Sequence, residues 1–199
     1  MTQNNIKESY DEKFRQITGT GKELFFKYGI KRVTIEEICR EAGVSKMTFY
    51  KHFNNKIDLV KRIIDLLVSE NLTSYRELME RIDITFEEKV RLTIQMKLEG
   101  TSEIGDTFYD DYLVKSDPEL ASYIQIKSGS VFKEVLKDYI EAQERGDIRK
   151  DIKPEFILFF LNHIFELAKN EKLLKLYMHP WEVIMELVNF FFYGIMSRK

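Results

Sequence analysis

The chain has 199 residues, of which 44% are hydrophobic and 32% are charged, and its 31 basic and 33 acidic residues give a net charge of −2. Its length and its 15 Phe and 10 Tyr residues are sufficient for a buried core, which excludes an intrinsically disordered protein. A single cysteine excludes a disulfide scaffold, and we find no secretion signal and no apolar run long enough to span a bilayer, so we expect a cytoplasmic protein without a membrane segment.

The first forty residues predict two helices with defined ends. Apolar residues recur at helical spacing from about residue 6 to residue 28, and Gly29 ends this run. The segment Thr34-Ile-Glu-Glu37 has the form of a capping box, in which the Thr oxygen accepts from a backbone N–H and the Glu reaches back. This box predicts a short helix that ends near Glu41.

A second short helix follows after the turn Ala42-Gly43-Val44, where Gly43 can take a positive φ. Ser45 caps this helix, which we expect to end near Phe53. Two short helices around a tight turn, here residues 34–53, form a helix-turn-helix, whose second helix enters the DNA major groove. We expect its first turn to contact base edges and the following polar residues to contact phosphates. The predicted contacts are Ser45, Lys46, Met47, Thr48, Tyr50, Lys51, His52 and Lys56.

The rest of the chain also predicts helices. Asn55 caps a long helix to about Ile82, a second capping box begins at Thr85, and each of the three prolines stands where a helix would start. Further helices are expected near residues 86–100, 106–115, 118–145, 154–177 and 180–196. We therefore predict an all-α fold of about nine helices, with an N-terminal three-helix helix-turn-helix domain (1–54) and a C-terminal helical domain for ligand binding and dimerisation (55–199).

The last two predicted helices, near residues 154–177 and 180–196, are apolar on nearly all sides. A helix on the surface of one subunit needs only one apolar face. Large apolar interfaces are typical of obligate oligomers, so we expect a homodimer formed through these helices. The alternative is that they are central helices of a monomer.

Charge is distributed unevenly along the chain. Residues 1–60 contain 11 basic and 8 acidic residues, which gives this part a net charge of +3. Residues 61–199 contain 20 basic and 25 acidic residues, which gives a net charge of −5. The basic balance of the first part supports local contacts with phosphates, while the acidic part disfavours non-specific wrapping of DNA.

Three segments resemble the N-terminal domain of the TetR family of bacterial transcriptional regulators. They are residues 23–29 (ELFFKYG), 34–45 (TIEEICREAGVS) and 49–59 (FYKHFNNKIDL). The resemblance covers roughly residues 8 to 60, while the later part matches the family only in helical character and length. Met47 stands where the family commonly has a small residue.

The resemblance implies a dimeric regulator, commonly a repressor, that binds a palindromic operator. It implies phosphate contacts by Thr34, Tyr50, His52 and Lys56 and base contacts by residues 46–48 and Lys51. It does not identify a ligand, because the ligand domains of this family diverge.

A ligand pocket is expected in the C-terminal domain. Asn162 and His163 interrupt an apolar helix, and a polar group in such a place is either satisfied within the core or anchors a ligand in a mostly apolar pocket. The pocket candidates are Met96, Phe108, Tyr109, Tyr112, Ile126, Phe159 and His163, each of which has the alternative of being plain core.

No catalytic or metal-binding motif is present, so we expect neither an enzyme nor a cofactor. We predict a ligand-responsive transcriptional regulator, a homodimeric repressor that binds a palindromic double-stranded DNA operator and is released by a small hydrophobic inducer. The alternatives are a DNA-binding factor of the same fold without a small-molecule ligand, and a helical carrier of a hydrophobic ligand that does not bind DNA.

Overall fold

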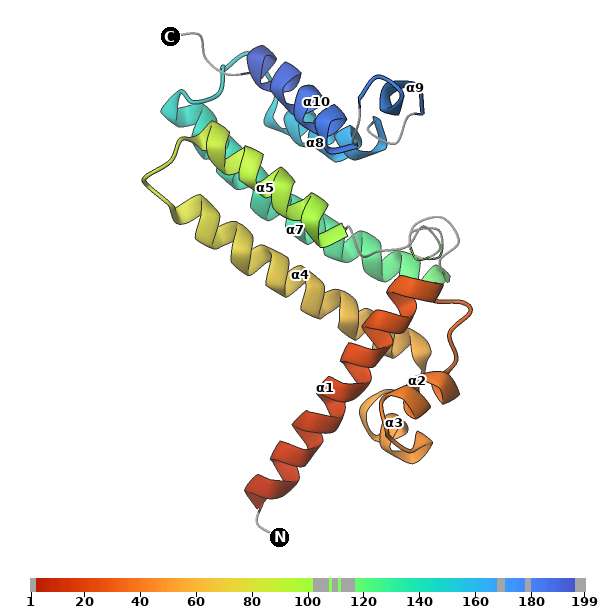
Figure 1. The fold of residues 1–199 in the computed structure, drawn as a ribbon. Helices are drawn as coiled ribbons and strands as arrows, with labels where there is room; N and C mark the ends of the chain where they lie inside the picture. The colour runs from red at the N-terminus through yellow and green to blue at the C-terminus, as the bar shows by residue number, and fades with distance from the viewer. Residues whose placement is uncertain are drawn as a thin grey trace. The chain divides into compact units, whose positions relative to one another are not determined.

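The computed structural model of the chain describes residues 3–101, 108, 111, 117–167, 171–177 and 180–195. The elements within these ranges are helices (Figure 1), which confirms the predicted all-α fold. The chain divides into two compact units, one made of residues 1–74 and 98–127 and the other of residues 75–97 and 128–199. The predicted functional boundary at residue 54 is a different division and stays a prediction.

The first unit contains three N-terminal helices, α1 (Gln3–Tyr28), α2 (Ile35–Glu41) and α3 (Lys46–His52), which contact one another. It also contains most of α4 (Lys56–Glu80) and the first part of α7 (Pro118–Arg145). Apolar side chains that face inward at helical spacing form its core. The fully buried members include Ile17, Phe25, Val33, Ile38, Phe49, Leu59, Val60 and Leu120.

Local hydrogen bonds set the helix starts where the sequence predicts them. Thr34 Oγ1 accepts from the backbone N–H of Glu37 at 3.2 Å, and Thr85 Oγ1 accepts from that of Glu88 at 3.2 Å. Such a cap satisfies an N–H that has no partner inside the helix and contributes about 1 kcal/mol. At the other ends, Gly29 (φ 85°) follows α1 and Gly43 (φ 62°) follows α2, both in the left-handed region that favours glycine.

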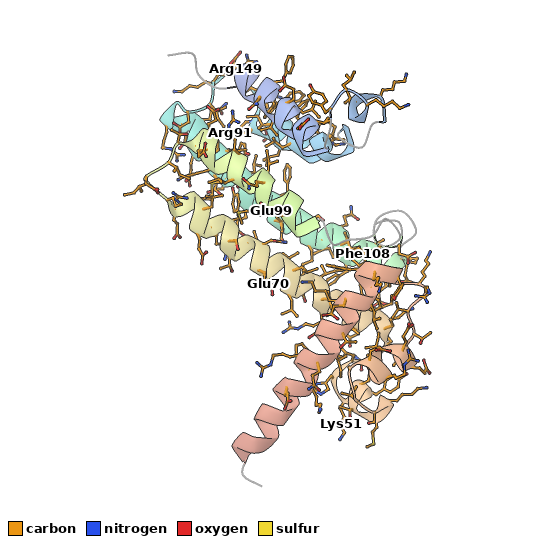
Figure 2. The ribbon with its side chains drawn as sticks, in the orientation of Figure 1. Lys51, Glu70, Arg91, Glu99, Phe108 and Arg149 are labelled. Atoms are coloured by element: carbon orange, nitrogen blue, oxygen red, sulfur yellow. The ribbon has the colours of Figure 1, made fainter. Side chains whose placement is uncertain are left out.

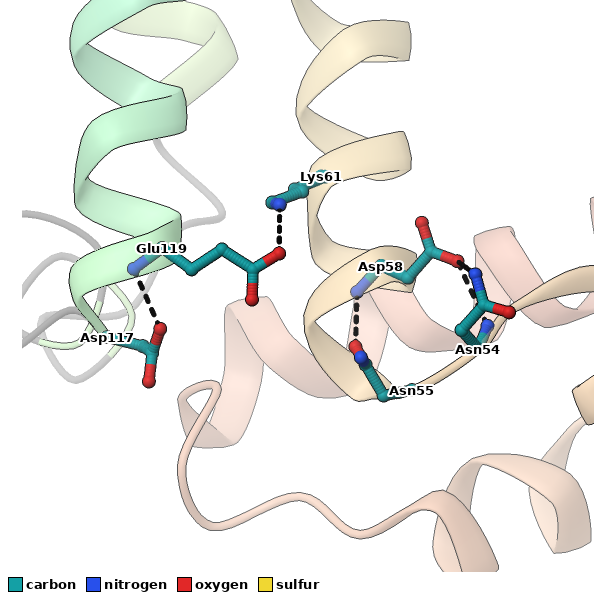
Figure 3. Close-up of polar contacts among 6 residues, drawn as sticks. All are labelled: Asn54, Asn55, Asp58, Lys61, Asp117 and Glu119. Atoms are coloured by element: carbon teal, nitrogen blue, oxygen red, sulfur yellow. Dashed lines mark hydrogen bonds and ion pairs between the residues drawn. The ribbon is translucent and has the colours of Figure 1, made fainter.

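Side-chain hydrogen bonds of Asn55 and Asp58 fix the start of α4 (Figure 3). Asn55 Oδ1 accepts from the backbone N–H of Asp58 at 2.8 Å, which confirms Asn55 as the predicted cap. The Asp58 carboxylate in turn accepts from the backbone N–H and the side-chain amide of Asn54, at 3.0 and 3.1 Å. These bonds fix the short connection between α3 and α4, so the position of α3 is tied to the long helix that follows.

Helices α4 and α7 are joined by polar contacts within the first unit. Lys61 Nζ lies 2.5 Å from Glu119 Oε1 (Figure 3). One turn further along α4, Asp65 Oδ1 accepts from Tyr123 Oη at 2.5 Å and pairs with Lys127 Nζ at 2.6 Å. Burial alone would raise the pKa of Asp65, but the bonds from Lys127 and Tyr123 outweigh it and lower the pKa below its ordinary value, so the carboxylate stays ionised.

The second unit contains the end of α4, most of α5 (Phe86–Thr101) and the later part of α7. Tyr75 donates to Asp138 Oδ2 at 2.7 Å, and the rings of Phe86 and Tyr139 meet edge to face at 5.2 Å. Helices α8 (Pro154–Leu167) and α10 (Pro180–Ile195) pack on each other, with Phe160 and Phe191 stacked at 4.6 Å. The short helix α9 (Glu171–Leu174) lies between them in sequence.

Two predictions of helix extent meet different outcomes. The single helix predicted near residues 154–177 is described as α8 to Leu167 and as α9 over residues 171–174, and residues 168–170 lie outside the described ranges. Its predicted end is a few residues too late, because residues 175–177 form a turn. Periodicity alone does not locate a helix end to within a few residues. The predicted helix near 106–115 lies outside the described residues except for positions 108 and 111.

Candidate nucleic-acid interface

Helix α3 buries one face and exposes the other. Phe49 and, just after the helix, Phe53 are buried, and the Phe53 ring stacks on Phe14 of α1 at 5.5 Å. On the opposite face Met47 and Tyr50 are 69% and 54% exposed. These side chains form the part of α3 that is accessible to another molecule.

Hydroxyl groups fix the first turn of α3. Ser45 Oγ accepts from the backbone N–H of Thr48 at 3.0 Å, and the two hydroxyl oxygens lie 2.9 Å apart. Ser45 is therefore confirmed as the predicted cap. Since each hydroxyl both donates and accepts, this pair can still bond to a phosphate or a base edge. Lys51 is exposed near the other end of α3 (Figure 2).

Lys46, the first residue of α3, forms an ion pair with Glu36 of α2. Both side chains are more than half exposed, so solvent screens the pair and it separates at little cost. Their hydrogen bond raises the pKa of Lys46 and lowers that of Glu36, which keeps both groups charged. The sequence predicted Lys46 as a base contact but gave no sign of its partner ten residues earlier.

Lys56, a predicted phosphate contact, binds the backbone in this structure. Its Nζ donates to the carbonyl oxygens of Val33 at 2.8 Å and Lys31 at 3.1 Å, in the loop between α1 and α2. Burial lowers its pKa, although the charge of Asp111 opposes this shift. An ammonium has three N–H donors, so one remains for a phosphate oxygen. The carbonyl contacts were not predicted, because residues 23 and 25 positions apart carry no local signal.

His52 lies at the edge of the aromatic core, with its ring centroid 6.1 Å from that of Phe14 and 6.2 Å from that of Phe53. Burial lowers the pKa of His52 below its ordinary value, and the positive charge of Lys51 lowers it further. His52 is therefore mainly neutral at pH 7, and its predicted phosphate contact would be a hydrogen bond rather than an ion pair.

Two cations beside this region were missed by sequence reasoning. Arg32 and Lys27 both lie over the ring of Tyr28, with the Arg32 Cζ at 4.4 Å and the Lys27 Nζ at 5.0 Å from its centroid. Both are exposed, and Arg32 stands two residues before the cap Thr34. The available signal was the proximity of Lys31 and Arg32 to the predicted cap.

The pocket candidates fall into both compact units. Phe108, which is labelled in Figure 2, is buried. Its ring centroid lies 4.9 Å from that of Phe26, whereas Ile126, in the same unit, is exposed. The Nδ1 of His163, an exposed residue, lies 2.7 Å from the Phe159 carbonyl oxygen of the preceding helical turn. Met96 is 37% exposed, and Tyr109 and Tyr112 lie outside the described residues. Their role in a pocket stays a prediction.

In the described part of the chain, no group of three His, Cys, Asp or Glu side chains is arranged to hold a metal ion. Among the helices described, none is long and apolar enough to cross a membrane.

Comparisons with known proteins bear on the N-terminal segment and on the fold. Residues 17–63 match the family model of bacterial regulatory proteins of the tetR family. The HTH-type transcriptional regulator TtgR of Pseudomonas putida is 39% identical over 61 residues, which are 31% of this chain and 29% of that protein. The HTH-type transcriptional regulator UidR of Escherichia coli is 25% identical over 150 residues, 69% of each chain.

Solved structures extend the similarity in fold to nearly the whole chain. The regulatory protein TetR from Rhodobacter sphaeroides superposes with a TM-score of 0.71 at 18% identity, covering 92% of this chain and 98% of that one. The reduced form of E. coli NemR superposes with a TM-score of 0.74 at 14% identity, covering 93% of this chain and 97% of that one. The matched segment spans less than a third of TtgR, so this sequence relationship covers only part of either protein. TtgR and UidR are named as transcriptional regulators, and the Rhodobacter sphaeroides protein is named as a regulatory protein.

Proposed function

We propose that the protein is a DNA-binding transcriptional regulator, because residues 17–63 match the family model of bacterial regulatory proteins of the tetR family. The observation that carries the proposal is the construction of α3. Its buried face is held by Phe49 and Phe53, while the first turn presents Lys46 and Met47 to solvent. A rigid helix whose N-terminal side chains are exposed and able to bond is what readout in the major groove requires.

We further propose that the protein acts as a homodimer through α8 and α10. Each of these helices buries apolar residues and still exposes large ones: Phe159 on α8 is 59% exposed and Phe190 on α10 is 80% exposed. A second copy of the chain would cover them. A twofold dimer would present two copies of α3, and the operator would be a palindrome with half-sites about 34–36 Å apart.

The finer mechanism is repression relieved by a small hydrophobic inducer. Helix α4 is continuous from Lys56 to Glu80, so the same helix carries the Lys56 contacts beside α2 and the Tyr75 bond to Asp138. An inducer that prefers one arrangement of this helix would change operator affinity, and the operator would change inducer affinity by the same factor, typically equivalent to about 1–3 kcal/mol. As the relatives are bacterial and DNA is the target, the cytoplasm is the proposed location.

The experiment that tests the proposal is selection of bound sequences from random double-stranded DNA with the purified protein. Enrichment of a palindrome with two equivalent half-sites is expected, together with binding that weakens steeply with salt. Native mass spectrometry of the same sample would identify a dimer and any co-purifying small molecule. If no sequence is enriched and binding is insensitive to salt, the protein is not a DNA-binding regulator.

A further inference from the structure

Glu36 occupies an unusual place for an acidic residue in a protein proposed to bind a polyanion. It lies in the first turn of α2, and its carboxylate contacts the ammonium of Lys46, the first residue of α3. The N-terminal end of α3 is the part that enters the major groove. The ion pair therefore puts a carboxylate at the reading end of the helix.

A carboxylate in this position limits what the protein can bind. Phosphate oxygens repel it, and within the major groove only the N4 amino group of cytosine and the N6 amino group of adenine can donate to it. The ammonium of Lys46 needs acceptors, and the N7 and O6 atoms of guanine provide two on one base. Along the major-groove edge of a G·C pair, these two acceptors stand beside the cytosine amino group, which matches an ammonium next to a carboxylate.

The exposure of the pair makes this exchange feasible. Both side chains are more than half exposed, so the contact between them is weak and can be replaced by contacts to DNA. On DNA without a suitable base pair, Lys46 can still turn to a phosphate, but Glu36 then faces the polyanion without a donor. The carboxylate would therefore oppose binding to non-cognate DNA more than binding to the operator.

We propose that Glu36 is a specificity-determining residue, which reads one G·C base pair in each half-site together with Lys46: the ammonium donates to guanine and the carboxylate accepts from the cytosine N4 amino group. This inference rests on the proposed function, because it assigns base contacts to the helix-turn-helix.

The test compares sequences selected from random DNA by the wild-type protein and three variants. In Glu36→Gln the charge is lost, and the amide both donates and accepts, so the preference for G·C at one position of each half-site should fall at least about fivefold while the other positions persist. Binding to random DNA should tighten. In Glu36→Asp the charge remains but is withdrawn by one methylene, so the base preference should weaken without tighter binding to random DNA.

Glu41→Gln is the matched control, because Glu41 lies on the same helix, is exposed and pairs with its neighbour Arg40 rather than with α3. It should leave the preferred sequence unchanged. Circular dichroism and thermal unfolding establish that each variant is folded.

The outcomes separate this inference from the proposed function. If wild-type protein enriches a sequence and Glu36→Gln enriches the same one with evenly raised affinity, Glu36 acts only through its charge and the inference is wrong. The inference is also wrong if the position that changes is an A·T pair. If wild-type protein enriches no sequence, the proposed function fails first.

Discussion

The ammonium of Lys56, in the first turn of α4, donates a hydrogen bond of 2.8 Å to the backbone carbonyl of Val33, next to the cap of α2. A second bond, of 3.1 Å, goes to the carbonyl of Lys31. In the same loop, the backbone N–H of Lys31 donates to the carboxylate of Asp111 at 2.8 Å. The loop between α1 and α2 is thus held by two residues from elsewhere in the chain, and the helix-turn-helix depends on them for its position.

We predict that Lys56→Met lowers the free energy of unfolding by about 1–3 kcal/mol, because two carbonyl oxygens lose a charged donor. DNA binding should weaken about equally for all sequences, and the dependence on salt should decrease. Denaturant unfolding and binding at several salt concentrations measure these effects. Lys51→Ala, which removes an equal charge from α3, should weaken DNA binding with a much smaller loss of stability. Unchanged stability of Lys56→Met would show that the carbonyl contacts do not support the loop.

Met47 is predicted to influence base preference without contributing to stability. Its side chain is 69% exposed on the outer face of α3, and surface substitutions of this kind usually change stability by less than about 0.5 kcal/mol. Met47→Ala should therefore leave thermal unfolding unchanged. The sequences selected from random DNA should lose their preference for thymine at the base whose C5-methyl group contacts the Met47 side chain. Selection of an identical motif by both proteins would exclude Met47 from the base-reading face.

Phe190 is predicted to lie in the dimer interface. Its side chain is 80% exposed although the neighbouring Phe191 is buried, so in the dimer the ring would be removed from water. Phe190→Glu should convert the dimer into monomers and weaken operator binding, because a buried unpaired charge is costly. Size-exclusion chromatography with light scattering gives the mass. Ile82→Glu is the control, since Ile82 is fully exposed in the loop after α4 and should leave the dimer intact.

The stability of the N-terminal domain should fall in mild acid because of His52. Burial lowers the pKa of His52 below the ordinary value of 6.5, so the unfolded chain binds this proton more tightly than the folded one. The stabilisation is fully present above pH 6.5 and is lost as the pH falls through the lower pKa of the folded state. Denaturant unfolding between about pH 7.5 and pH 5 should show this decline in the wild type and a weaker one in His52→Gln. Parallel curves for the two proteins would assign the decline to other groups.

The sequence by itself determined the features that depend on near neighbours. Thr34, Ser45 and Asn55 cap their helices through bonds that span three residues, so the residue types in that order were enough to locate the helix-turn-helix. The apolar period likewise determined the stripe on α4 that buries Val60 and Ile64. The same local rule located the end of the helix predicted near residues 154–177 only approximately, because residues 175–177 form a turn.

Only the tertiary structure decided which distant groups meet. It joined Lys56 to Val33, Lys46 to Glu36 and Phe108 to Phe26, pairs that are separated by between 10 and 82 positions. No spacing rule applies to such pairs, because their distance is set by how helices pack and not by the geometry of one helix. For that reason the sequence could identify Lys46 and Lys56 as cations of the DNA-binding region. Only the fold could show that one of them is paired with a carboxylate and the other holds the loop before α2.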